Sequence, residues 1–125
     1  MESGTYENLI KSMQQHAEKE NPKECCGIIT TDFSYVPYDN LSSDPENFFA
    51  LDPMAFVDHP DDCWGIFHSH PGQANPLPSE NDIASTSFEQ YRFVVGWKEK
   101  FYLYWYDRSI DSLRFKKFTE KHLCP

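Results

Sequence analysis

The sequence predicts an α/β domain in which helices flank a mixed β-sheet. Three observations support this fold class. An amphipathic helical pattern opens the chain, short apolar segments rich in β-branched and aromatic residues follow it, and two adjacent segments near the end are spaced as a β-hairpin. Helices interspersed with strands that return as hairpins are typical of a mixed sheet covered by helices.

Length and charge limit what this chain can be. Its 125 residues are enough for one domain spanning residues 1–125 but not for two. The formal net charge of −9 disfavours binding to nucleic acid or to an anionic membrane, since both reward basic surfaces. No apolar run approaches the roughly 20 residues of a membrane-spanning helix, and the N-terminus lacks the features of a signal peptide. We therefore expect a protein kept in the cytoplasm or carried in a particle assembled there.

A helix over residues 6–20 is the first element expected. Asn21-Pro22 ends it, because a residue before proline disfavours the helical conformation. Its apolar residues recur at i, i+3 and i+4 and form one stripe that can be buried. The stripe consists of Tyr6, Leu9, Ile10, Met13 and Ala17.

Short strands and a short helix are expected between residues 24 and 62. The segment 25–31 is apolar and β-prone, which predicts a buried strand with Glu24 at its entrance. Further strands are expected at 33–37 and 47–51, separated by a polar loop. Asp52-Pro53 provides an N-cap and a proline at the first helical position, which predicts a short helix ending near Asp58.

The second half supplies the centre of the sheet. A buried strand is expected over 64–70, and a helix over 79–91. Two strands at 92–98 and 101–107 are expected to be joined by a tight turn at Glu99-Lys100, with a last strand at 113–118. The run from Phe101 to Tyr106 has no polar alternation, which predicts a strand covered on both faces; an aromatic peptide-binding groove is the alternative.

Two histidines at the end of the 64–70 strand form the centre of a candidate metal site. His68 and His70 are two positions apart, so their side chains project from the same face of a strand. Asp82 lies twelve positions after His70, beyond a proline-broken loop, and can return over the strand end. Two imidazoles and one carboxylate with an open fourth position make a catalytic zinc site. The alternative is a pair of hydrogen-bonded core histidines, whose burial without a shared partner is costly.

The segment Ser79-Glu80-Asn81-Asp82 supports a second interpretation. It is a capping-box pattern, in which Ser79 is the N-cap and Asp82 reaches back to its amide. Capping and metal binding are compatible, because a carboxylate has two oxygens and a hydroxyl can rotate between partners. Glu80 is expected to point away from the histidines.

These motifs resemble those of a known family. His68-Ser69-His70-Pro71 followed by Ser79-x-x-Asp82, with Glu24 upstream, is similar to the signature of the JAMM (MPN+) zinc metallopeptidases. The resemblance covers nearly the whole chain. Within the family, the run from Pro22 to Gly27, the later Asn40-Leu41 and the short length look most like the JAMM domain of phage tail tip assembly proteins. One departure is the eleven residues between His70 and Asp82, where the family usually has ten.

The resemblance implies a fold, a reaction and a role for each site residue. The fold is an α-β-α sandwich of the cytidine-deaminase-like type, and the reaction is hydrolysis of a peptide or isopeptide bond. His68, His70 and Asp82 would hold Zn²⁺. Glu24 would act as general acid/base toward the attacking water and the leaving amine, and Ser79 would hydrogen-bond the oxyanion. Ser69 is expected to face the other side of the strand in a supporting role.

The resemblance also implies partners and leaves alternatives open. The substrate would be a protein or peptide, and the phage relatives suggest tail tip proteins and a cell-wall cysteine peptidase encoded separately. A non-catalytic, zinc-stabilised component of the tail tip and an enzyme that removes ubiquitin-like modifiers are the two alternatives. No pair of cysteines has C-x-x-C spacing, so free buried thiols are expected. The cysteines are Cys25, Cys26, Cys63 and Cys124, and the histidines expected at the surface are His16, His59 and His122.

Overall fold

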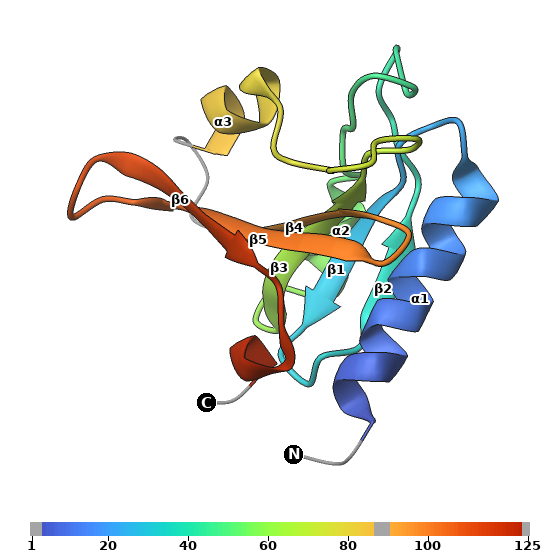
Figure 1. Ribbon diagram of the computed structural model, residues 1–125. Coiled ribbons are helices and arrows are strands. Elements are labelled where there is room, and N and C mark those ends of the chain that lie inside the picture. Colours follow the sequence, from blue (N-terminus) through green and yellow to red (C-terminus); the bar gives the residue numbers. More distant parts are fainter. Residues whose placement is uncertain (1–3, 87–90, 124–125) are drawn as a thin grey trace.

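A single six-stranded sheet organises the computed structural model, which describes residues 4–86 and 91–123. The strand order is β2-β1-β3-β4-β5-β6, and every neighbouring pair is antiparallel except the parallel pair β3 and β4 (Figure 1). The expected mixed sheet is therefore confirmed. The elements are α1 (Thr5–Glu20), β1 (Cys26–Thr30), β2 (Tyr35–Tyr38), α2 (Met54–Asp58), β3 (Cys63–Ser69), α3 (Glu80–Thr86), β4 (Arg92–Trp97), β5 (Lys100–Asp107), β6 (Ser112–Lys117) and the 3₁₀ helix η1 (Glu120–Leu123).

Helices cover both faces of the sheet. In Figure 1 the long helix α1 runs along one side, and its buried stripe packs on a core that includes Ile29 and Phe67. On the other face α2 inserts Ala55 into a second core with Ile28 and Ile66. Strand alternation explains the two cores, because successive side chains of β1 and β3 point to opposite faces. This three-layer arrangement agrees with the expected α-β-α sandwich.

Strand β5 contributes to both cores, as its unalternated aromatic run predicts. Leu103 packs in the core under α1, whereas Tyr104 packs in the core under α2. Burial declines toward the far end of the strand, where Trp105 and Tyr106 are only partly buried. The turn between β4 and β5 lies at Lys98-Glu99, one residue earlier than expected, and Lys98 adopts a positive φ of 58° there.

The strand expected at residues 47–51 is absent, and Asn40 explains why. Only Leu51 pairs, in an isolated bridge with Asn40. The Asn40 amide donates to the carbonyls of Glu24 (2.9 Å) and Phe48 (3.0 Å), and its oxygen accepts the N–H of Ala50 (3.0 Å). The Asn40 side chain thus satisfies most of this backbone, and only one backbone bond, from the Leu41 N–H to the Ala50 carbonyl, joins it to the neighbouring segment. Hydrophobic periodicity does not reveal such side-chain bonds.

Two further boundaries differ from expectation. Strand β2 begins at Tyr35 rather than Phe33, because residues 31–34 form a turn in which Phe33 has a φ of 63°. The helix expected over 79–91 is observed as α3 from Glu80 to Thr86; Tyr91 is not helical, and residues 87–90 lie outside the described part of the chain.

The three histidines expected at the surface are each partly buried and bonded. His16 Nδ1 lies 2.6 Å from the hydroxyl of Tyr35, and His59 Nδ1 lies 3.0 Å from an Asp62 oxygen. His122 Nδ1 accepts the N–H of Thr119. Each therefore has a local structural partner that sequence spacing did not indicate.

The cysteines follow expectation where they are described. Cys25 and Cys26 are buried free thiols, and Cys63 is a free thiol that is partly exposed. Cys124 lies outside the described residues. None of the described helices is both long and apolar enough to cross a membrane.

Asn40→Ala is expected to lower the free energy of unfolding by about 1–3 kcal/mol, because it leaves several backbone groups without partners. Urea denaturation measures this loss. Asn47→Ala is the matched control, since the Asn47 side chain bonds only the exposed Asp44 carboxylate; it should change stability by less than about 0.5 kcal/mol. Equal effects of the two substitutions would contradict the role given to Asn40.

Candidate functional site

Strand β3 places the two histidines at the centre of the molecule. His68 pairs with Cys26 of β1 on one side and with Val95 of β4 on the other. His70 lies just beyond β3, and its N–H donates to the carbonyl of Gly96 over 3.1 Å. Both imidazoles are buried and lie on the face covered by α2, with ring centroids 5.0 Å apart. The same-face prediction from their spacing is confirmed.

The pairing of β1 with β3 brings Glu24 to these histidines. The two strands are antiparallel, so Glu24, two positions before the first residue of β1, lies near the end of β3. Glu24 is 6% exposed, and its Oε1 lies 3.5 Å from His68 Nδ1. Its N–H donates to the carbonyl of Pro45, and its own carbonyl accepts from Asn40. A glutamate at a strand entrance usually faces solvent, whereas this one is buried.

Ser69 holds the same junction from the opposite face of β3. Its Oγ accepts the N–H of Cys25 over 2.8 Å, and its own N–H donates to the Cys25 carbonyl. Ser69 is fully buried. These two bonds hold Cys25, the neighbour of Glu24, against Ser69, which lies between the two histidines. Ser69 therefore has the supporting role expected of it.

The third candidate ligand, Asp82, is positioned by the first turn of α3. Ser79 and Asp82 form the expected capping box: the Ser79 N–H donates to Asp82 Oδ2 (2.9 Å), and the Asp82 N–H donates to Ser79 Oγ (3.1 Å). The same Oδ2 lies 3.2 Å from His70 Nε2 and 3.7 Å from His68 Nε2. The eleven residues between His70 and Asp82, of which the last two belong to α3, thus still return the carboxylate to the histidines.

One oxygen of Asp82 approaches Nε2 of both histidines. With bonds of about 2.0–2.1 Å, the ligand atoms of tetrahedral zinc lie roughly 3.4 Å apart, and the two distances from Asp82 lie on either side of that value. Glu24, His68 and His70 also offer ligand atoms within 4.8 Å of one another. Nδ1 of each histidine is buried without a hydrogen-bond partner. Each ring is held by the protein at Nε2 only, and a buried nitrogen without a partner is uncommon in a protein core.

The electrostatics of the cluster favour a cation between its members. Burial alone would raise the pKa of Asp82, but the charges of His68 and His70 and the bonds from His70 and the Ser79 amide lower it to about 2. Burial would lower the pKa of His70, but the hydrogen bond to Asp82 and the charges of Asp82 and Glu24 raise it. Both shifts show that Asp82 and His70 favour opposite charges on each other.

Two aromatic residues complete the site, and neither was identified from the sequence. The Tyr104 hydroxyl lies 2.7 Å from His68 Nε2, and burial raises its pKa well above the ordinary value, so it remains a proton donor. Phe49 stacks on the His68 ring with centroids 4.2 Å apart. Tyr104 is 36 positions from His68 in the chain, and its aromatic segment indicated only a core strand.

The remaining residues of the motif lie at the edge of this cluster. Ser79 is exposed, and its hydroxyl bonds the Asp82 amide. Glu80 is exposed at the start of α3. The candidate ligand group among the described residues consists of Glu24, His68 and His70, and includes neither Glu80 nor Asp82. The expected orientation of Glu80 away from the histidines agrees with its position.

Comparison with known proteins identifies a family, a similar sequence and a similar fold. Residues 7–109 match the family model of prokaryotic homologues of the JAB domain. Over 101 residues the chain is 35% identical to the tail tip assembly protein K of Escherichia phage N15, a match that covers 74% of this chain and 40% of that protein. The chain thus spans well under half of that relative. The solution structure of a protein from Desulfitobacterium hafniense shares the fold, with a TM-score of 0.64 at 24% identity over 94% of both chains.

Tyr104→Phe tests which nitrogen of His68 receives the metal. Zinc at Nε2 must break the bond from the Tyr104 hydroxyl, so removing that hydroxyl should tighten zinc binding about 2- to 10-fold, as expected for a net hydrogen bond of about 0.5–1.5 kcal/mol. Competition with a chromophoric chelator measures the change.

Tyr102→Phe is the matched control, because its hydroxyl bonds Asn75 instead of the cluster. It should leave zinc affinity unchanged. Weaker zinc binding in Tyr104→Phe would mean that the hydroxyl supports a ring coordinated through Nδ1, on the side of Glu24.

Proposed function

This chain belongs to the prokaryotic homologues of the JAB domain, and we propose on that premise that it is a zinc-dependent peptidase or isopeptidase. The convergence of Asp82 on the two buried histidines carries the proposal. Asp82 Oδ2 lies 3.2 Å from His70 Nε2 and 3.7 Å from His68 Nε2, and the buried Glu24 lies 3.5 Å from the other nitrogen of His68. A fold alone would not identify a reaction, but this donor set matches that of catalytic zinc sites.

His68, His70 and Asp82 would hold the ion. When bound, zinc acts as a Lewis acid that lowers the pKa of water to about 7 and polarises a carbonyl group. The protein holds these side chains in place before any ligand arrives, because β3 lies in the middle of the sheet and the capping box fixes Asp82. Such preorganisation lowers the cost of assembling the site.

Glu24 is the general base in this proposal. Its carboxylate accepts a proton from the attacking water as the new C–O bond forms, and passes that proton to the amine nitrogen as the C–N bond breaks. Bonds from its backbone to Pro45 and Asn40 hold it beside His68. A carboxylate that serves as base has to stay free of the metal, which leaves the third ligand position to Asp82.

Ser79 is proposed to stabilise the oxyanion that develops on the substrate carbonyl. In the capping box its oxygen accepts the Asp82 N–H and its own hydrogen is not required. The hydroxyl can therefore cap α3 and donate to an oxyanion at the same time. Its exposure at the edge of the cluster supports access by a substrate.

The biological process proposed is phage tail assembly. The similarity to a tail tip assembly protein supports it, although the match covers 40% of that relative. The substrate would be a protein or peptide of the tail tip. The net charge of −9 makes a basic surface the easier partner to accommodate.

Metal analysis tests the proposed ligands. Purified protein should contain roughly one zinc per chain, and His68→Ala and Asp82→Asn should each lose it, because three protein ligands are the minimum for such a site. Inductively coupled plasma mass spectrometry measures the content, and circular dichroism checks the fold. A folded wild-type protein that takes up no zinc would contradict the proposed zinc-dependent activity.

Glu24→Gln separates chemistry from metal binding. It should keep zinc and fold but lower peptide cleavage at least ~10²-fold, because the glutamine cannot take up a proton. The assay is incubation with tail tip components followed by mass spectrometry of fragments. Glu46→Gln is a matched control, since Glu46 is exposed on a nearby loop. Normal phage assembly with Glu24→Gln, but not with His68→Ala, would favour the non-catalytic zinc-stabilised component of the tail tip.

A further inference from the structure

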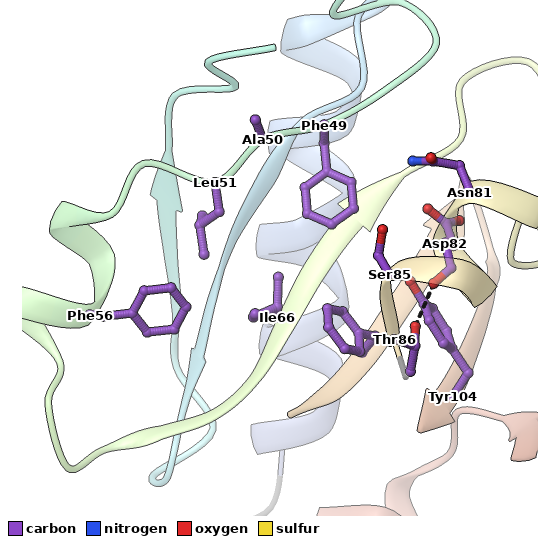
Figure 2. A pocket seen from close by; sticks show the side chains of 11 residues that line it. Phe49, Ala50, Leu51, Phe56, Ile66, Asn81, Asp82, Ser85, Thr86 and Tyr104 are labelled. Atoms are coloured by element: carbon purple, nitrogen blue, oxygen red, sulfur yellow. Dashed lines mark hydrogen bonds between the residues drawn. The ribbon is translucent and has the colours of Figure 1, made fainter. Parts of the chain in front are cut away.

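A pocket of about 250 Å³ adjoins the candidate metal centre (Figure 2). Asp82 and Tyr104 line this pocket and also belong to the histidine cluster. Phe49, which stacks on His68, forms part of its wall. The pocket therefore shares Asp82 and Tyr104 with the histidine cluster and lies beside it.

The lining of the pocket is apolar inside and polar on one side. Ile66 of β3 and Phe93 of β4 are almost fully buried beneath it, and Phe56 of α2 closes one end. Figure 2 shows Asn81 and Ser85 of α3 on the side opposite Phe56. Both are exposed, so they can hydrogen-bond a ligand that lies across the opening.

The volume indicates what this pocket can hold. An apolar cavity of about 150 Å³ accommodates a benzene molecule, whereas sites for whole small-molecule ligands usually measure about 300–1,000 Å³. A space of about 250 Å³ lies between these values. It suits one aliphatic or aromatic side chain better than a complete cofactor.

We propose that this pocket binds a leucine-like or phenylalanine-like side chain of the peptide substrate, next to the bond to be cleaved. The inference rests on the proposed hydrolysis and adds the substrate class to it. The apolar interior receives the side chain, while Asn81 and Ser85 bond the polar backbone of the same residue. Burying such a side chain distinguishes it from glycine by at least ~10-fold.

Binding is tested first, without any cleavage, on ¹⁵N-labelled protein with and without zinc. The probes are N-acetyl-L-leucinamide and N-acetyl-L-phenylalaninamide, with N-acetylglycinamide as the comparison. The two apolar probes should shift the amide signals of Ile66 and Phe93 with dissociation constants in the millimolar range, as expected for ligands of this size. Equal shifts with the glycine compound would overturn the proposal, and this comparison needs no variant.

Ser85→Trp is designed to fill the pocket from its exposed side. It should weaken binding of the leucine probe at least ~10-fold while the remaining amide signals keep their positions. Ala84→Trp is the matched control, because it adds the same bulk at the neighbouring position of α3, which does not line the pocket. Unchanged binding in Ser85→Trp would overturn the proposal.

Cleavage is tested second, on zinc-loaded protein with a peptide library varied at each position. One position beside the cleaved bond should prefer leucine or phenylalanine over glycine at least ~10-fold, and Ser85→Trp but not Ala84→Trp should lose this preference. Cleavage at equal rates whatever the side chain would contradict the proposed role of the pocket but would support the proposed hydrolysis. Binding of the leucine probe without cleavage of any peptide would support side-chain binding in the pocket and contradict the proposed peptidase activity.

Discussion

The antiparallel register of β1 on β3 is the constraint on which the site depends. Cys26 lies opposite His68, so the two strands bring Glu24 beside the paired histidines, although some 44 residues separate them in the chain. Ser69 locks this register through two bonds to the Cys25 backbone, and Asn40 holds Glu24 from the other side. A slip of one residue would turn these side chains to the opposite face of the sheet.

A second constraint brings in the aspartate. The capping box is an ordinary device for starting a helix, yet here one oxygen of Asp82 accepts the Ser79 amide and also approaches both histidines. The contact that caps α3 therefore also positions Asp82 beside the histidines. Because α3 also forms one side of the apolar pocket, this short helix contributes both the candidate ligand Asp82 and the polar residues Asn81 and Ser85 of the pocket.

Much of the architecture follows from local patterns, and the errors have a common cause. The helical stripe of α1, the buried strands β1 and β3, and the hairpin of β4 and β5 were all predicted from residue spacing. The segment 47–51 was not, because the Asn40 side chain replaces a neighbouring strand as its hydrogen-bond partner. The same kind of long-range contact half-buries His16 against Tyr35.

The sequence by itself determined which side chains are candidates for the site. Spacing placed the two histidines on one face, the capping box placed Asp82 in the first turn of a helix, and the motifs indicated the family. Only the tertiary structure decided that Glu24 is buried beside His68, that Tyr104 occupies its Nε2, and that an apolar pocket opens next to Asp82. The physical reason is that periodicity describes one element at a time, whereas these features arise where separate strands and helices pack together.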